Sequence, residues 1–179
     1  MRPNLSRRNF IAASSGILLS AAANPAYSNI VEGARKISFD CLHTGEKLNV
    51  EYWAKGRYIP GALAEVDKVL RDFRTGDIHP IAPELLDLLA KLHSVLNSRA
   101  RFQVISGYRS PHTNTLLHKQ SAGVANHSLH MQGMAIDIRL GDRSLTDLHL
   151  AALSLKGGGV GYYPQSDFLH VDVGRLRRW

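Results

Sequence analysis

The segment SLHMQGMAID, residues 128–137, joins a turn to a short apolar strand and carries two side chains suited to metal binding. Asp137 lies between two isoleucines, where a carboxylate without a partner is costly, so it is normally paired or bound to a metal. Because neighbouring side chains on a strand face opposite ways, an Asp137 turned toward solvent is the alternative. Gly133 permits a turn that brings His130 back beside Asp137.

A second polar pattern follows in DFLHVDV, residues 167–173. The period of two on a strand places His170 and Asp172 on one face, and the intervening apolar residues on the other. Two histidines and one carboxylate suit Zn²⁺ and leave a fourth position for water, whose pKa zinc lowers to about 7. A single histidine on a strand is more often structural, so the interpretation depends on the joint pattern.

The remaining patterns predict one α+β domain with a central, mainly antiparallel sheet flanked by helices. Alternating apolar residues indicate a β-hairpin with strands at 37–41 and 48–52. Further along the chain, apolar residues recur at helical intervals in some segments and form short strand-like runs in others. The helices are expected at 61–73, 83–96, 112–119 and 144–154, and the strands at 102–105, 134–138, 159–163 and 168–173. Helices and strands mixed without a regular βαβ alternation are typical of this class.

Length and composition exclude several classes of protein. A chain of 179 residues has room for one domain, and 44% hydrophobic against 21% charged residues argues against a long disordered tail. One cysteine, Cys41, excludes an internal disulfide framework and a multi-cysteine metal site. The formal charge of +7 falls to +4 without the three arginines near the N-terminus. That excess is weak support for nucleic acid, and no nucleic-acid partner is expected.

Residues 1–28 have the features of a removable targeting segment. Three arginines precede a stretch of 13 apolar and small residues at 11–23, whereas a spanning helix needs roughly 20. The sequence SRRNFI at 6–11 resembles the twin-arginine export signal. We therefore expect export by the twin-arginine translocase to the periplasm, with a mature domain at 29–179 and no stable membrane span. A chance basic N-terminus on a cytoplasmic protein is the alternative.

Three motifs together carry a resemblance to a known family. They are SGYRS at 106–110, then Ser128, His130, Gly133, Ala135 and Asp137, and finally HVD at 170–172. This set resembles the LAS zinc peptidases, which include D-Ala-D-Ala metallopeptidases and phage L-alanyl-D-glutamate endopeptidases. The closing segment, 158–179, is similar to the twin-arginine-exported murein endopeptidase K group of Gram-negative bacteria. The resemblance covers roughly residues 36–179.

The resemblance implies a ligand set, a fold and an activity. The ligands of one zinc ion per chain would be His130, Asp137 and His170, in a hedgehog/D,D-peptidase-like fold. The implied activity is hydrolysis of peptide cross-links in peptidoglycan, at links involving meso-diaminopimelate. Two alternatives stay open. One is a D,D-carboxypeptidase or dipeptidase that trims stem peptides, and the other is a non-catalytic, zinc-containing module that binds peptidoglycan.

Two further aspartates are expected to act beside the metal, one as the general base and the other as a hydrogen-bond partner of a ligand histidine. Asp167 stands three residues before His170, and in phage-type relatives an acid at this offset is the general base. A turn-capping residue is the alternative for Asp167. Asp172 is expected to bind the second nitrogen of a ligand histidine instead.

Substrate contacts are expected from three residues in or beside the motifs. Arg109 lies on a turn after a strand, and in the family the matching arginine faces the substrate carbonyl. A fixed guanidinium there stabilises an oxyanion or grips a carboxylate. Ser128 is expected to hold a metal ligand or the loop by hydrogen bonding, and His127 beside it to contact the substrate; both are candidate substrate-binding residues. Trp53 and Trp179 are expected to be core or end anchors rather than glycan-stacking surfaces.

Overall fold

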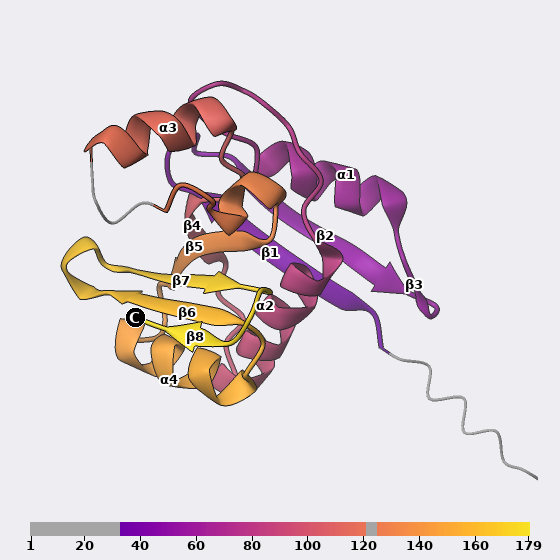
Figure 1. Cartoon of the computed structure of the whole chain (residues 1–179). Helices are drawn as coiled ribbons and strands as arrows, with labels where there is room; N and C mark the ends of the chain where they lie inside the picture. Colours follow the sequence, from indigo (N-terminus) through magenta and orange to yellow (C-terminus); the bar gives the residue numbers. More distant parts are fainter. Residues whose placement is uncertain (1–32, 121–124) are drawn as a thin grey trace, which may run out of the picture.

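One eight-stranded sheet runs through the part of the chain that the structure describes, residues 33–120 and 125–179 (Figure 1). In this computed structural model the strands follow the order β3-β2-β1-β4-β5-β7-β6-β8. The predicted leader at 1–28 lies outside the described residues, so it stays a prediction.

The first part of the sheet is the predicted hairpin. β1 (Arg35–Cys41) pairs antiparallel with β2 (Lys47–Ala54), and Phe39 lies opposite Leu48. β2 then turns into β3 (Arg57–Tyr58) through Lys55 and Gly56, which both have positive φ. Two consecutive positive φ values match the twist of a tight hairpin, so this turn adds a short strand that the alternation did not predict.

The second part of the sheet holds the remaining strands. β4 (Phe102–Ser106) lies parallel to β1 and antiparallel to β5 (Ala135–Leu140). β7 (Phe168–Asp172) is antiparallel to both β5 and β6 (Gly159–Tyr163). The short β8 (Arg177–Arg178) lies parallel to β6. Five antiparallel and two parallel pairings among the described strands confirm a mainly antiparallel sheet.

Four α-helices accompany these strands in the described residues. α1 (Pro60–Val69) and α2 (Pro83–Leu96) each begin at a proline, whose missing N–H costs nothing in a first turn. α3 (Pro111–Gln120) follows β4, and α4 (Leu145–Leu155) lies beside α2 below the strands in Figure 1. α1 ends before the predicted residue 73. The carbonyl of Leu70 instead accepts a hydrogen bond from the Tyr108 N–H at 2.7 Å, which ties the helix end to the SGYRS segment.

The core lies on one face of the sheet, and the polar motifs lie on the other. Ile136 and Ile138 of β5, with Leu169 of β7, are fully buried in the core together with residues of α1, α2 and α4. Full burial of each such side chain contributes about 1.5–3 kcal/mol to folding. Asp137 pairs with His170 across β5 and β7, so alternation places both on the face opposite the core.

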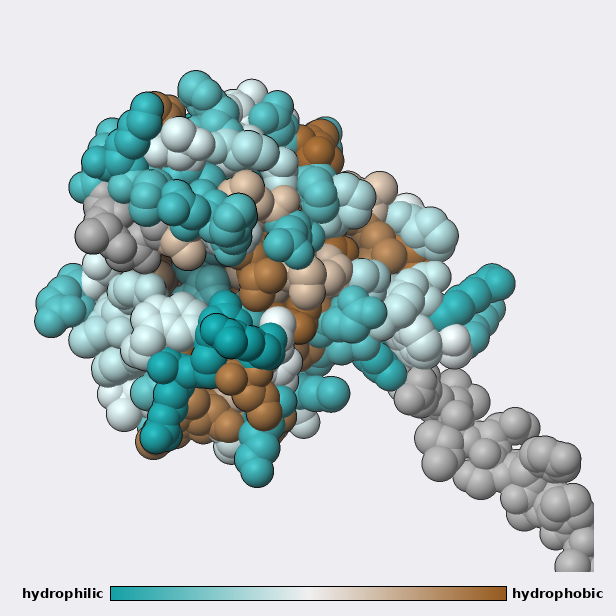
Figure 2. Space-filling model, in the orientation of Figure 1, coloured by the Kyte–Doolittle hydropathy of each residue, from teal (hydrophilic) through white to brown (hydrophobic). Residues whose placement is uncertain are grey.

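The surface in the view of Figure 2 is largely hydrophilic, with an apolar patch at its lower edge near α4 and β8. The exposed Leu176 lines a hollow with Ala152 and Leu153 of α4. Among the residues of 33–120 and 125–179, no helix has the length and apolar character that crossing a membrane requires.

Candidate functional site

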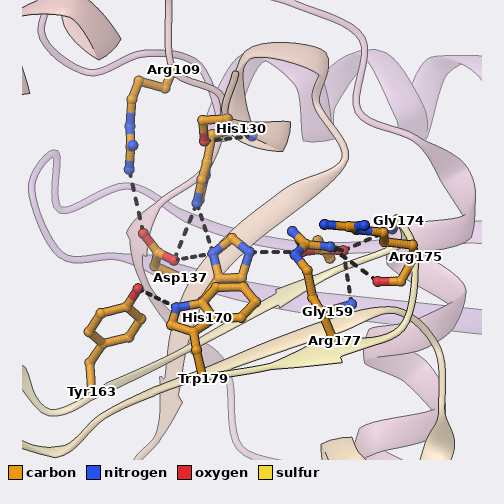
Figure 3. Close-up of polar contacts among 12 residues, drawn as sticks. Arg109, His130, Asp137, Gly159, Tyr163, His170, Gly174, Arg175, Arg177 and Trp179 are labelled. Atoms are coloured by element: carbon orange, nitrogen blue, oxygen red, sulfur yellow. Dashed lines mark hydrogen bonds and ion pairs between the residues drawn. The ribbon is translucent and has the colours of Figure 1, made fainter. Parts of the chain in front are cut away.

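Three buried side chains meet on the polar face of the sheet: His130, Asp137 and His170 (Figure 3). Each offers one ligand atom, and these atoms all lie within 4.8 Å of one another. Oδ1 of Asp137 lies 2.9 Å from Nδ1 of His170 and 3.3 Å from Nε2 of His130. The two ring nitrogens are 3.2 Å apart. Asp137 is only 6% exposed, so the alternative of a solvent-facing carboxylate is wrong.

His130 is brought to Asp137 by a 3₁₀ turn, η1 (Leu129–Gln132). Ser128 caps this turn, and its Oγ accepts a hydrogen bond from the His130 N–H at 3.3 Å. Gly133 ends the turn with φ of 65°, a conformation that glycine adopts without strain. A Cβ at this position would lie 2.1 Å from the carbonyl oxygen of Pro80. The turn that the sequence predicted at Gly133 is therefore present. Two separate features favour glycine at this position: the positive φ and the close approach of the Pro80 carbonyl.

Hydrogen bonds on the outer side of each ring determine which nitrogen faces the cluster. Nδ1 of His130 lies 2.7 Å from the carbonyl oxygen of Gly107, so this nitrogen carries the proton and Nε2 presents a lone pair. Nε2 of His170 lies 3.0 Å from Oδ2 of Asp172, which leaves Nδ1 to present its lone pair. Two nitrogen lone pairs and a carboxylate oxygen thus converge on one point. Such a set repels itself unless a cation or protons lie between its members.

The pKa values of the cluster show the same demand for positive charge. Burial alone would lower the pKa of His170, but hydrogen bonds with Asp137 and Asp172 raise it to about 9. Burial alone would raise the pKa of Asp137, but the two histidines hold it well below its ordinary value. The arrangement therefore stabilises a positive charge among the three side chains, and a metal cation meets that demand.

Asp172 is a fully buried anchor behind His170. Its Oδ1 accepts hydrogen bonds from the backbone N–H groups of Gly159 at 2.9 Å and Gly174 at 2.8 Å. Nη2 of Arg177 donates to Oδ2 at 2.6 Å. Burial opposes ionisation, yet the hydrogen bond with His170 and those from the Gly159 and Gly174 N–H groups lower the pKa of Asp172 to about 2. The carboxylate therefore stays charged and lies at the second nitrogen of His170, where the sequence predicted it.

The cluster opens into a cavity of about 540 Å³. The walls combine cationic, hydroxyl and aromatic side chains around the three buried residues. Among the lining residues are Arg109, His127, Ser128, Tyr163, Phe168 and Trp179. His127 is exposed and Ser128 is half-buried, and both sequence-predicted contact residues line this space.

Arg109 enters the cavity from the turn after β4. Its backbone N–H donates to the carbonyl oxygen of His130 at 3.2 Å, and the neighbouring N–H of Ser110 donates to Oδ2 of Asp72 at 2.9 Å. Nη2 of Arg109 lies 3.7 Å from Oδ2 of Asp137. Its Nε is buried without a hydrogen-bond partner among the described residues. Burial lowers the pKa of Arg109 and Asp137 raises it. A guanidinium with unused donors is thus held beside the cluster.

Asp167 does not join the cluster, contrary to the placement that the sequence predicted. Its backbone is left-handed, with φ of 51°, after the 3₁₀ turn η2 (Pro164–Ser166). Its carboxylate is 63% exposed and accepts a hydrogen bond from Nη1 of Arg139 at 2.6 Å. Arg139 stands two residues beyond Asp137 on β5, and with Asp167 it lines a separate hollow. A role for Asp167 as general base therefore stays a prediction without support from its position.

Tyr163, Arg177 and Trp179 line the cavity, although the sequence patterns did not predict any of them there. Trp179, expected to be a core or end anchor, is 49% exposed and so is not a core residue, and its ring centroid lies 5.3 Å from that of His170. A signal existed for Tyr163. Gly161 pairs with His170 across β6 and β7, so the period of two places Tyr163 on the same face as that histidine.

The chain is similar along most of its length to proteins of a known family. The family model described as peptidoglycan L,D-endopeptidase MepK matches residues 29–179. Peptidoglycan L,D-endopeptidase MepK of Escherichia coli strain K12 is 39% identical over 175 residues, covering 96% of both chains. A probable peptidoglycan L,D-endopeptidase MepK of Haemophilus influenzae is 40% identical over 146 residues, which cover 81% of this chain and 78% of its own. The chain therefore belongs to the Peptidase_M15_2 family, that of peptidoglycan L,D-endopeptidase MepK.

Proposed function

We propose that this protein is a periplasmic, zinc-dependent endopeptidase that hydrolyses peptide cross-links in peptidoglycan. The observation that carries the proposal is the buried cluster of His130, Asp137 and His170 on the floor of an open cavity. The names of its relatives, peptidoglycan L,D-endopeptidases, support the class of substrate and reaction.

The donor set fits zinc. Two imidazole nitrogens and one carboxylate oxygen are the ligand types of catalytic zinc sites, which keep a fourth position open for water or substrate. When bound, zinc polarises a carbonyl and lowers the pKa of a water to about 7, which provides hydroxide for attack on an amide. His130 and His170 would each bind it through the nitrogen that its outer hydrogen bond leaves unprotonated.

The residues around the cluster hold and orient the substrate. The Arg109 guanidinium, 11% exposed and only loosely paired with Asp137, can donate to a peptide carbonyl or carboxylate in the cavity. Phe168 and Trp179 provide apolar walls that reduce the water content around the reacting group. Stem peptides with meso-diaminopimelate carry free carboxylates, which suits a cavity lined by Arg109, Arg177 and His127.

The test is digestion of purified sacculi, followed by separation of the muropeptides. We expect cross-linked dimers to become monomers with zinc, and no change after chelation. His130→Ala and His170→Ala should lose most zinc and all hydrolysis. His149→Ala is the matched control, because that ring stacks on Tyr162 outside the cavity and should change neither. Shortened stems with intact cross-links would indicate a carboxypeptidase instead, and binding without any product would indicate a non-catalytic module.

The proposed location rests on the SRRNFI sequence at 6–11, which lies outside the described residues, and on the peptidoglycan substrates of the relatives. Replacement of Arg7 and Arg8 by lysine should block export through the twin-arginine translocase and leave the fold intact. The measurement is the amount of protein in the periplasm relative to the cytoplasm. Normal periplasmic accumulation of the double variant would show another export route.

A further inference from the structure

Tyr163 and Trp179 form a hydrogen-bonded pair on the wall of the cavity. Nε1–H of Trp179 donates to the hydroxyl oxygen of Tyr163 at 2.7 Å. Both side chains line the cavity, and Figure 3 shows them beside Asp137 and His170. Neither residue belongs to the three motifs from which the sequence predicted the site.

The indole of Trp179 is held in place from several directions. The backbone N–H of Trp179 donates to Val160 at 3.2 Å, and its carbonyl accepts from Tyr162 at 3.0 Å. The ring lies so close to Gly161 that a Cβ there would be 2.7 Å from it. The guanidinium of Arg177 lies 5.0 Å from the ring centroid. The position of the Nε1–H group is therefore determined by the sheet rather than by a mobile side chain.

The ring of Tyr163 is held by a stacking contact and a hydrogen bond. It stacks on Phe168 with centroids 4.6 Å apart and an interplanar angle of 18°. Its oxygen accepts the indole proton, and within residues 33–120 and 125–179 its own O–H has no acceptor. A phenol that already accepts one hydrogen bond is a better donor, because hydrogen bonds in a chain polarise one another. Tyr163 thus offers an oriented proton donor to a ligand in the cavity.

We propose that the Tyr163 hydroxyl donates a hydrogen bond to the carbonyl oxygen of the peptide bond under attack, and that Trp179 is its positioning residue. This inference rests on the proposed function. Figure 3 shows Arg109 and Tyr163 on opposite sides of Asp137. A peptide group bound at the cluster would therefore have the Arg109 guanidinium on one side and the Tyr163 hydroxyl on the other. Hydrolysis adds the hydroxide of water to the carbonyl carbon and its proton to the leaving nitrogen as the C–N bond breaks. Tyr163 keeps its own proton and stabilises the negative charge that develops on the oxygen.

The experiment compares Tyr163→Phe, Trp179→Phe and the double variant on a purified cross-linked muropeptide dimer. Tyr163→Phe removes only the hydroxyl, and we expect kcat to fall about 10²-fold, the loss typical of one oxyanion donor, while KM and zinc content stay unchanged. Trp179→Phe keeps an aromatic wall and should cause a smaller fall. Because Trp179 acts through the hydroxyl, the double variant should match Tyr163→Phe. Tyr162→Phe is the control, since its hydroxyl lies near Thr146 and outside the cavity.

A second measurement on zinc-free protein is independent of turnover. The indole N–H resonance of Trp179, assigned by its loss in Trp179→Phe, should move upfield in Tyr163→Phe because the acceptor has gone. The resonance of Trp53 should not move.

Distinct results overturn the inference and the proposed function. If the wild-type protein cleaves the dimer and Tyr163→Phe keeps a near-normal kcat, or only raises KM, the inference is wrong. A further loss on adding Trp179→Phe to Tyr163→Phe would overturn the positioning role. If the wild-type protein does not cleave the dimer at all, the proposed function is wrong and the inference with it.

Discussion

Asp172 and His170 stand two residues apart on β7, and the carboxylate of Asp172 binds the ring of His170 from the side away from the cluster. Nε2 of His170 lies 3.0 Å from Oδ2 of Asp172, while Nδ1 lies 2.9 Å from Oδ1 of Asp137. The strand period therefore aligns one histidine between two carboxylates. The inner carboxylate is a candidate ligand, and the outer one determines which nitrogen is free to bind the metal.

The first prediction concerns this outer carboxylate. Asp172→Asn removes the charge that orients His170 and that pairs with the Arg177 guanidinium. We expect zinc affinity to fall about 10–100-fold, as is usual for such outer partners of metal ligands. Competition with a chromophoric chelator measures the affinity. Asp142→Asn, at an exposed aspartate outside the cavity, should bind zinc normally. Equal affinities in the two variants would contradict the role of Asp172.

The second prediction concerns Asp167. Because its exposed carboxylate pairs with Arg139 outside the cavity, Asp167→Asn should keep its zinc and a rate within about 3-fold of normal, and should lose at most about 1 kcal/mol of stability. Sacculus hydrolysis and zinc content provide the test. A fall of roughly 10²–10⁴-fold with zinc retained would restore Asp167 as the general base.

The third prediction concerns the glycine that ends the η1 turn. Gly133→Ala places a Cβ in a left-handed residue and against Pro80, whereas Gly45→Ala meets only the left-handed strain, with open space around it. The strain alone costs roughly 1–2 kcal/mol. Denaturant unfolding should therefore show a larger loss for Gly133→Ala. Zinc affinity should fall in Gly133→Ala alone, because the turn carries His130. Similar losses of unfolding free energy in the two variants would rule out the clash with Pro80.

The fourth prediction concerns stability in acid. Burial opposes ionisation of Asp72, but hydrogen bonds from residues around it, Ser110 and Arg74 among them, lower its pKa from 3.8 to about 2. The folded state thus binds this proton less readily than the unfolded state. The resulting stability, about 2 kcal/mol, is fully present above pH 5 and is lost as the pH falls through 3.8 toward 2.

Asp72→Asn removes this contribution. Urea unfolding should show the variant about 2 kcal/mol less stable than the wild type at pH 7, with the gap narrowing toward pH 2.5. The difference between the two proteins separates Asp72 from Asp137 and Asp172, which also titrate in acid. A gap that stays constant over this range would assign the loss to packing rather than to charge.

The local pattern of the sequence determined most of the fold and the centre of the site. A period of two placed Asp137 and His170 away from the core on their strands, and a glycine at 133 marked the turn that returns His130 to them. These features act over a few residues, because backbone geometry relates neighbours directly. The parallel pairings of β1 with β4 and of β6 with β8 join segments that are not consecutive strands in the sequence. The alternation of side chains within a strand does not predict such pairings.

Only the tertiary structure decided which side chains complete the cavity. Asp167 has the right offset from His170 along the chain, yet a left-handed backbone and Arg139 on the neighbouring strand hold its carboxylate outside. Trp179 reaches Tyr163 from 16 residues away, because its backbone pairs with β6 and Gly161 leaves room for the indole. Spacing along a chain predicts which face a residue occupies. Its partners depend on strand register and close packing, which exist only once the sheet is assembled.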